Sequence, residues 1–194
     1  RLLQCAEISP SGNRAVFDFR GEILTVPAEK GDARNITQTD NAHEKYPAWS
    51  PDGKSIAYFS DASGEYTLHI KPQDGSGTAR VLKLNGTGFY ANIHWSPDSK
   101  KICFVDNGRN LYLLDVATGN QQKIDADELY VPGAFREQFG DWSPDSKWLV
   151  YTKVTGTFFK KAILYSVDQN KSFPITDGLS DVSEPIFDRG GKYL

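Results

Sequence analysis

The sequence predicts an all-β protein, a β-propeller of four-stranded antiparallel blades, on the strength of three observations. A Trp-Ser-Pro-Asp motif recurs along the chain, short apolar runs of strand-forming residues follow each copy, and glycine- or asparagine-rich turns separate the runs. The 17 glycines and 10 prolines are spread over all 194 residues, which argues against long helices. We expect about four complete blades and the start of a fifth, as a fragment of a larger wheel.

The period of the repeat identifies the architecture. The motif at residues 49–54 returns at residues 95–100 and 142–147, with a divergent earlier copy at Ser9 and a decayed later one at Asp188. A period in the forties with four strands per unit is typical of propeller blades. The successive spacings are 41, 46, 47 and 45 residues, counted between Ser9, Ser50, Ser96, Ser143 and Asp188.

The strands of each unit follow in a fixed order. The first strand is expected to end at the aromatic residue of the motif, and glycine-containing turns predict hairpins between the later ones. The second strands are predicted at residues 15–17, 56–59, 102–105 and 148–151. The third strands are predicted at residues 23–26, 68–70, 111–116 and 163–167. The fourth strands are predicted at residues 36–37, 81–82, 123–124 and 174–176.

The motif itself has the composition of a tight turn. Proline presets φ near about −65°, aspartate accepts hydrogen bonds from backbone amides, and glycine or a small residue takes the permissive position. The tryptophan before it is predicted to be a wedge between blades, because a buried indole covers a large apolar area. Structural roles are therefore expected for Trp49, Pro51, Asp52, Trp95, Pro97, Asp98, Trp142, Pro144 and Asp145.

The repeat also predicts the domain organisation. Residues 1–194 are expected to form a single partial propeller domain, with blades at about 1–40, 41–86, 87–133 and 134–178 and a partial blade at 179–194. The chain contains no methionine and stops within a repeat. We therefore expect it to be a processed or truncated part of a longer protein.

Composition argues against several functions. With 22 Lys and Arg against 25 Asp and Glu, the net charge of −3 does not favour nucleic-acid binding, and no apolar run is long enough to predict a membrane span. Two cysteines cannot supply a disulfide framework or a four-ligand zinc site. The sequence contains neither a G-x-S-x-G nor an H-E-x-x-H motif. No catalytic residue, metal or cofactor is predicted.

Loop residues remain as candidates for binding. Loops that lead into first strands share a face of a propeller with the loops between second and third strands, and function on repeat scaffolds usually resides on loops. His94 precedes Trp95 on a first strand, and first strands line the central channel, so His94 is a candidate to face it, although a packed or solvated histidine is the favoured interpretation. An ordinary packed or solvated side chain remains the alternative at each position. The candidates for the channel or its rim are His43, Tyr46, Tyr90, His94, Tyr130, Arg136 and Glu137.

Five stretches of the chain carry a family resemblance, at residues 20–31, 46–54, 60–66, 111–119 and 175–181. They resemble tricorn-type serine peptidases, and the resemblance covers essentially the whole chain. It implies the beginning and middle of the second, larger propeller of that family, which has seven blades and filters and channels unfolded peptides to a distant serine site. PDZ and catalytic domains are implied farther along the parent chain, so no catalytic residue of the family is transferred to this one.

Two other functions stay open. The Ser-Pro-Asp-Gly-Lys motif is shared with TolB, so a TolB-like protein-interaction propeller is the main alternative, and an enzyme with its active site on the propeller is a third. The expected partners are peptide substrates and the remaining blades, PDZ and catalytic domains of the parent chain, without nucleic acid or membrane. A homo-oligomer of the full-length protein is left open. Free thiols favour the cytoplasm, with a periplasmic or secreted location as the alternative.

Overall fold

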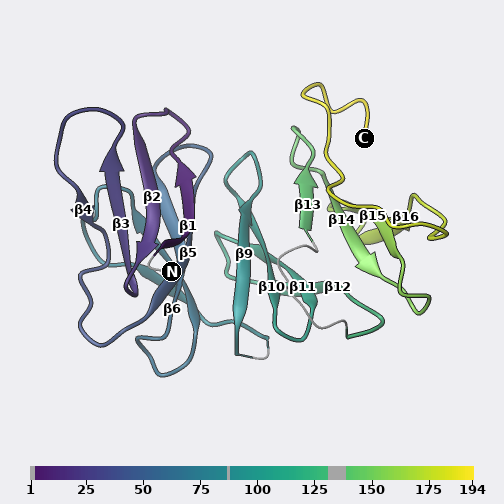
Figure 1. Ribbon diagram of the computed structural model, residues 1–194, viewed down its shortest axis with the longest axis horizontal. Helices are drawn as coiled ribbons and strands as arrows, with labels where there is room; N and C mark the ends of the chain where they lie inside the picture. Colours follow the sequence, from purple (N-terminus) through teal and green to yellow (C-terminus); the bar gives the residue numbers. More distant parts are fainter. Residues whose placement is uncertain (1–2, 87, 131–138) are drawn as a thin grey trace. The chain divides into compact units, whose positions relative to one another are not determined.

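The computed structural model describes residues 3–86, 88–130 and 139–194. Within these ranges the chain forms sixteen strands and no helix, and the strands make four antiparallel sheets of four strands each (Figure 1). In every sheet the strands follow one another in chain order, as in a meander. None of the described residues forms a helix that is long and apolar enough to cross a membrane.

The sheets correspond to successive repeats. The first contains β1 (Leu3–Ile8), β2 (Arg14–Phe19), β3 (Glu22–Pro27) and β4 (Arg34–Asn35). The second contains β5 (Glu44–Trp49), β6 (Ser55–Ser60), β7 (Thr67–Pro72) and β8 (Arg80–Leu82). The third contains β9 (Tyr90–Trp95), β10 (Lys101–Asp106), β11 (Asn110–Asp115) and β12 (Gln121–Ala126). The fourth contains β13 (Phe139–Trp142), β14 (Trp148–Val154), β15 (Lys160–Ser166) and β16 (Lys171–Pro174).

Internal contacts divide the chain into two compact units, residues 1–95 and 96–194. Unit 1 holds the first and second sheets together with β9. Unit 2 holds β10 to β12, the fourth sheet and the segment that follows it. Each unit is described by itself below.

Hydrogen bonds from its own side chains stabilise the Ser-Pro-Asp turn. The Ser50 hydroxyl donates to Asp52 Oδ1 at 2.6 Å, and the Ser55 amide donates back to Ser50 Oγ at 2.9 Å. Gly53 has a φ of 71°, in the left-handed region that glycine adopts without strain. These local bonds explain why the same residue types recur at each turn. Equivalent serine–aspartate bonds of 2.6 Å join Ser96 to Asp98 and Ser143 to Asp145.

In unit 1 the motif's first tryptophan lies between two sheets. Trp49 is 4% exposed and packs in one cluster with Val16 and Ile23 of the first sheet and with Ile56 of its own sheet. Its backbone amide donates to Glu7 Oε2 at 2.7 Å, which adds a polar link from β1 to β5. Burial of an indole in such a cluster stabilises the contact by several kcal/mol, at about 25 cal/mol per Å².

The fourth strands of the first and fourth sheets lie slightly earlier than the sequence pattern predicts, whereas β8 and β12 include the predicted residues. In the first sheet, β4 ends at Asn35, because the Asn35 Oδ1 accepts the amides of Thr37 and Gln38, each at 3.1 Å, and bends the chain. In the fourth sheet, β16 ends at Pro174, which has no amide hydrogen to donate to a ladder. Residues 179–194, the start of the fifth repeat, contain a turn at Asp188 but no strand.

A bulge interrupts the first strand of the second sheet. The register between β5 and β6 shifts between Lys45 and Ala48, and Tyr46 has a φ of 55°. Asn92 occupies the same repeat position in β9, three residues before its tryptophan, and has a φ of 58°. A bulge breaks the alternation of side chains between the two faces of a strand and redirects those beside it. This bulge positions the candidate site.

Candidate functional site in unit 1

Three of the residues that the sequence analysis selects lie together in unit 1. Tyr46 meets Phe59 edge-on, with ring centroids 6.5 Å apart, and Phe59 stacks on Tyr90 at 5.5 Å. The exposed His43 approaches the same group through Tyr66, whose hydroxyl lies 3.3 Å from His43 Nδ1. The loops that enter two first strands therefore meet the loop between β6 and β7.

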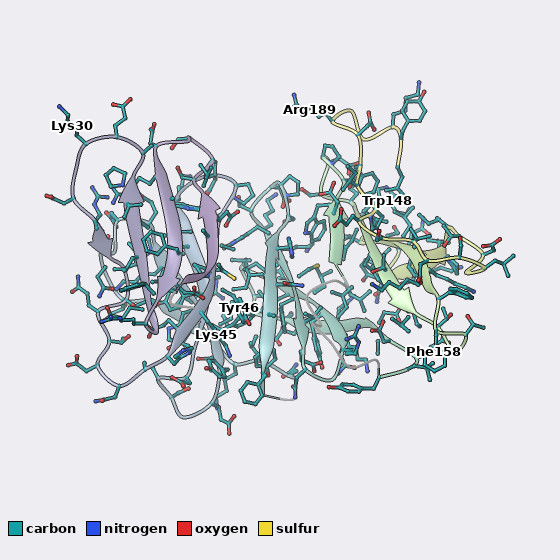
Figure 2. The ribbon with its side chains drawn as sticks, in the orientation of Figure 1. Lys30, Lys45, Tyr46, Trp148, Phe158 and Arg189 are labelled. Atoms are coloured by element: carbon teal, nitrogen blue, oxygen red, sulfur yellow. The ribbon has the colours of Figure 1, made fainter. Side chains whose placement is uncertain are left out.

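A lysine lies at the centre of this group. The Lys45 ammonium nitrogen is 3.7 Å from the ring centroid of Tyr66, 5.3 Å from that of Phe89 and 5.7 Å from that of Tyr46. Figure 2 shows Lys45 and Tyr46 beside each other. A cation within about 6 Å of a ring centroid is attracted by the negative face of the ring. We call the rings of Tyr46, Tyr66 and Phe89 around this ammonium the Lys45 cage.

Local structure supplies each member of the cage. The bulge in β5 lets the neighbouring side chains of Lys45 and Tyr46 approach each other, Tyr66 ends the turn before β7, and Phe89 directly precedes β9. The Asp61 carboxylate accepts the His43 amide at 2.7 Å and ties the two loops together. Burial raises the pKa of Tyr66, and the nearby Asp61 charge raises it further, so its hydroxyl stays protonated at neutral pH.

A cavity of about 590 Å³ adjoins the cage. Tyr66 lines it together with Glu65, Lys83 and Tyr90, whose hydroxyl accepts the Gly86 amide at 3.1 Å. Small-molecule and peptide side-chain pockets commonly have volumes of about 300–1,000 Å³ with mixed aromatic and polar walls. The site therefore combines an aromatic cage with room for a ligand beside it.

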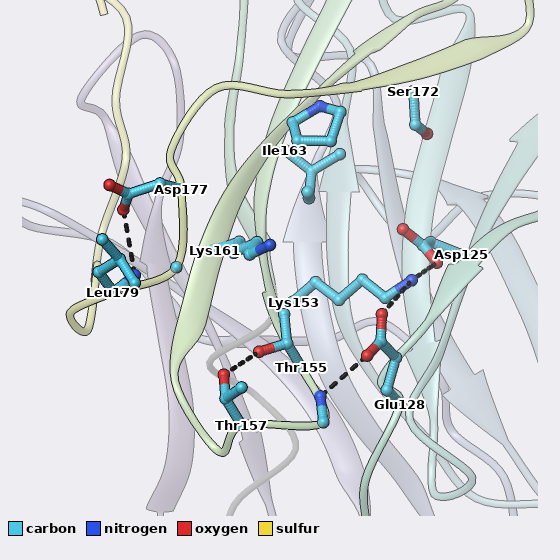
Figure 3. A pocket seen from close by; sticks show the side chains of 13 residues that line it. Asp125, Glu128, Lys153, Thr155, Thr157, Lys161, Ile163, Ser172, Asp177 and Leu179 are labelled. Carbon is cyan, nitrogen blue, oxygen red and sulfur yellow. Dashed lines mark hydrogen bonds and ion pairs between the residues drawn. The ribbon is translucent and has the colours of Figure 1, made fainter.

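Unit 2 contains a second cavity, of about 530 Å³ (Figure 3). The Lys153 ammonium lies 2.8 Å from Asp125 Oδ1 and 3.7 Å from Glu128 Oε1, and the Gly156 amide donates to Glu128 Oε2 at 2.8 Å. Lys161 belongs to the same lining. Lys153, Asp125 and Glu128 already pair with one another, so this cavity presents fewer groups that can contact a ligand than the site in unit 1 does.

The other predicted residues lie apart from the cage. His94 is partly buried on β9, and burial lowers its pKa to about 4, so it is neutral at pH 7. Tyr130 follows β12 in unit 2 and is 73% exposed. Arg136 and Glu137 lie outside the described residues.

Sequence analysis missed two central residues, Lys45 and Tyr66. Lys45 lies two residues after the selected His43 and directly before the selected Tyr46, but a lysine at the start of a strand carries no signal by itself. Tyr66 lies in a loop between second and third strands, on the face that the repeat assigns to functional loops. Its position on that shared face is the sequence feature that could have indicated Tyr66.

The side chains of the site suit noncovalent contacts. Among the described residues, no group of three His, Cys, Asp or Glu side chains is placed to hold a metal ion. Cys103 is fully buried, and burial raises the pKa of its thiol, which keeps it from acting as a thiolate. The aromatic faces and the cavity can instead hold a cationic or apolar side chain.

Tandem four-stranded antiparallel sheets, each with its strands in chain order, define a β-propeller protein. The sequence matches the family described as the tricorn protease second beta propeller domain over residues 3–194. The chain belongs to that family.

Individual relatives agree with this assignment. The chain is 28% identical to a tricorn-like protease C-terminal subunit of Sulfurisphaera tokodaii, over 90% of this chain and 19% of the relative. It is 29% identical to the tricorn protease homolog of Saccharolobus solfataricus, over 95% of this chain and 16% of the relative. The chain thus spans about a fifth or less of the length of these two relatives.

Solved structures support the fold. The crystal structure of the tricorn protease matches with a TM-score of 0.80 at 18% identity, over 96% of this chain and 18% of that one. A TolB structure from Agrobacterium tumefaciens matches with a TM-score of 0.66 at 22% identity, over 95% of this chain and 65% of that one. Because both sequence identities are below 25%, these matches support the fold and not a shared function.

Proposed function

We propose that this chain is a non-catalytic propeller segment of a tricorn-like serine protease and that it filters and channels peptide substrates to a distant catalytic domain. The family match supports the setting of the proposal. The observation that carries it is the Lys45 cage with its adjoining cavity, where side chains from β5 and from the loops before β7 and β9 offer binding surface. Such a site can hold a passing peptide without reacting with it.

The composition of the site suits weak and sequence-tolerant contacts. Phe89 is 56% exposed, and Glu65 and Lys83 place both charge signs at the cavity wall. Exposed rings contribute apolar contact that does not depend on one peptide sequence, and each is worth about 0.5–1.5 kcal/mol. A conduit needs contacts of this kind, because tight binding would retain the peptide.

Kinetics of the full-length protein with the Phe89→Ala variant would test the proposal. The specificity constant kcat/KM is compared for a long unstructured fluorogenic peptide and for a fluorogenic tripeptide. We expect a loss of roughly two- to tenfold for the long peptide, from one lost aromatic contact, and little change for the tripeptide. The matched control is Phe158→Ala, which removes an exposed ring from the β14–β15 turn of unit 2. Equal loss on both substrates, or no loss on either, would contradict the proposal.

A TolB-like interaction propeller is the second candidate, favoured by the structural matches. Two TolB structures match over 95% and 96% of this chain, with TM-scores of 0.66 and 0.65. In that function the loop surface would bind a folded partner protein and would show little affinity for unfolded peptides. A titration of the full-length protein with a reduced, unfolded peptide library separates the two, since only the channel function expects binding.

Several finer assignments accompany the proposal. We treat residues 1–194 as one partial domain of a seven-bladed propeller, with the blade limits given by the repeat. The proposed partners are peptide substrates and the remaining blades, PDZ and catalytic domains of the parent chain, and a homo-oligomer of the full-length protein stays open. A cytoplasmic location is proposed because Cys5 and Cys103 form no disulfide within the described part of the chain.

A further inference from the structure

The Lys45 cage is built as a receptor for a cation. Three aromatic rings lie within 6 Å of one ammonium nitrogen, measured from the centroids of Tyr66, Phe89 and Tyr46. Tyr66 and Phe89 also contact each other, with centroids 5.9 Å apart and planes inclined at 48°. Aromatic cages of this type are the general solution for recognition of alkylammonium groups. Here the occupant comes from the chain itself.

The cage is accessible from solvent. Phe89 is more than half exposed, and Lys45, Tyr46 and Tyr66 are only partly buried. The cavity of about 590 Å³ begins at Tyr66, so a ligand held there touches a ring that also contacts the Lys45 ammonium. A lysine side chain has several rotatable bonds and can leave such a site without movement of the backbone.

We propose that the Lys45 cage recognises the lysine or arginine side chain of a peptide, and that Lys45 is an internal competitor which such a side chain displaces. This inference rests on the proposed function, since it names the peptide feature that the channel recognises. The bound Lys45 ammonium shows which chemistry the rings accept. Charge favours the same occupant, because the two carboxylates of Asp61 and Glu65 lie beside the site against the one ammonium of Lys83 on the cavity wall, and the whole chain carries a net charge of −3.

Competition by Lys45 keeps the affinity of the cage low. A peptide cation gains the three ring contacts only when the Lys45 ammonium loses them. The net free energy of this exchange is therefore small. The apparent dissociation constant rises in inverse proportion to the fraction of molecules in which the cage is empty. Weak binding with fast release is what a passage for peptides requires. Removal of the competitor must then strengthen the binding of basic peptides.

The test measures peptide binding to the full-length protein by fluorescence anisotropy. Two acetylated, labelled peptides are used that differ only at one central residue, lysine in one and norleucine in the other. We expect Lys45→Met to lower the Kd of the lysine peptide by roughly fivefold, as one exposed cation–π site predicts, and to leave the norleucine peptide unchanged. Lys45→Arg keeps a competing cation and should behave like the wild type.

Two controls separate the cage from general electrostatics. Lys30→Met removes an equal charge from the exposed turn between β3 and β4, outside the cage and its cavity, and it should change the Kd of the lysine peptide by less than about twofold. Phe89→Leu in the Lys45→Met background removes one ring and should cancel most of the gain. An equal gain from Lys30→Met, an equal gain for the norleucine peptide, or no gain from Lys45→Met overturns the inference.

The outcomes also distinguish this inference from the proposed function. If both peptides bind and Lys45→Met gives no selective gain, the cage inference fails while the channel function stands. If neither peptide binds to any variant, both fail.

Discussion

Phenylalanine substitution at two equivalent tryptophans separates the packing of the indole from its hydrogen bond. Trp49 and Trp95 both end the first strand of a sheet and both lie in unit 1, with exposures of 4% and 9%. Trp95 Nε1 donates to the Ala48 carbonyl at 3.3 Å. Trp49 Nε1 is buried without a hydrogen-bond partner among the described residues. The same change therefore removes a bond at one site and an unsatisfied donor at the other.

The expected difference follows from these two environments. Both substitutions remove a similar buried volume, so the cavity cost is common to both. Trp95→Phe also loses a hydrogen bond, worth about 0.5–1.5 kcal/mol, whereas Trp49→Phe removes a buried unsatisfied donor that costs about 1–3 kcal/mol. The free energy of unfolding of unit 1 should therefore fall by about 2 kcal/mol more in Trp95→Phe than in Trp49→Phe.

Hydrogen exchange read by mass spectrometry measures this difference locally. Peptides that cover β5 and β6 report the opening of the second sheet, which contacts both tryptophans. A difference of about 2 kcal/mol corresponds to roughly a thirtyfold faster exchange in Trp95→Phe. Equal exchange in the two variants, or faster exchange in Trp49→Phe, would refute the assignment of the two indole environments.

Two further predictions concern titration and a buried ion pair. Burial lowers the pKa of His94 to about 4, against about 6.5 in the unfolded chain. The free energy of unfolding should therefore fall as the pH drops from 6.5 towards 4, by at most roughly 3 kcal/mol. Urea titrations of His94→Gln should show a weaker dependence of this free energy on pH in the same range. An unchanged slope would show that His94 is not shifted. Arg109→Met should cost about 3–5 kcal/mol in the same assay, because it leaves the 1%-exposed Asp127 side chain without its cation, and Asp127→Leu in that background should recover much of the loss. A cost below about 1 kcal/mol would place this pair among ordinary surface pairs.

Much of the fold could be predicted because its signals are local. The Ser50–Asp52 bonds form within one turn, so the turn is visible in six consecutive residues and its period reveals the repeat. Trp49 precedes that turn at a fixed distance, which places it on the first strand. The early end of β4 was harder to foresee, because it depends on whether the Asn35 side chain bonds to its neighbours or to a strand.

The site was less predictable because it depends on contacts between loops. In a regular strand, Lys45 and Tyr46 would point to opposite faces, and only the left-handed Tyr46 brings the ammonium within 5.7 Å of that ring. Tyr66 is separated from Lys45 by the whole of β6, and no periodic pattern connects them. His94, by contrast, satisfied the sequence criterion for a channel residue, yet it lies outside the cage.

Photo-crosslinking during turnover tests the central claim most directly. A photoreactive benzoylphenylalanine replaces Phe89 in the full-length protein, and a second variant carries it at the exposed Lys30, in the turn between β3 and β4, as control (Figure 2). Under illumination with a long labelled substrate, the account predicts that the peptide becomes attached at position 89 and not at position 30. Substrate cleavage that proceeds at the normal rate without attachment at position 89 would contradict a role for this propeller in the path of the peptide.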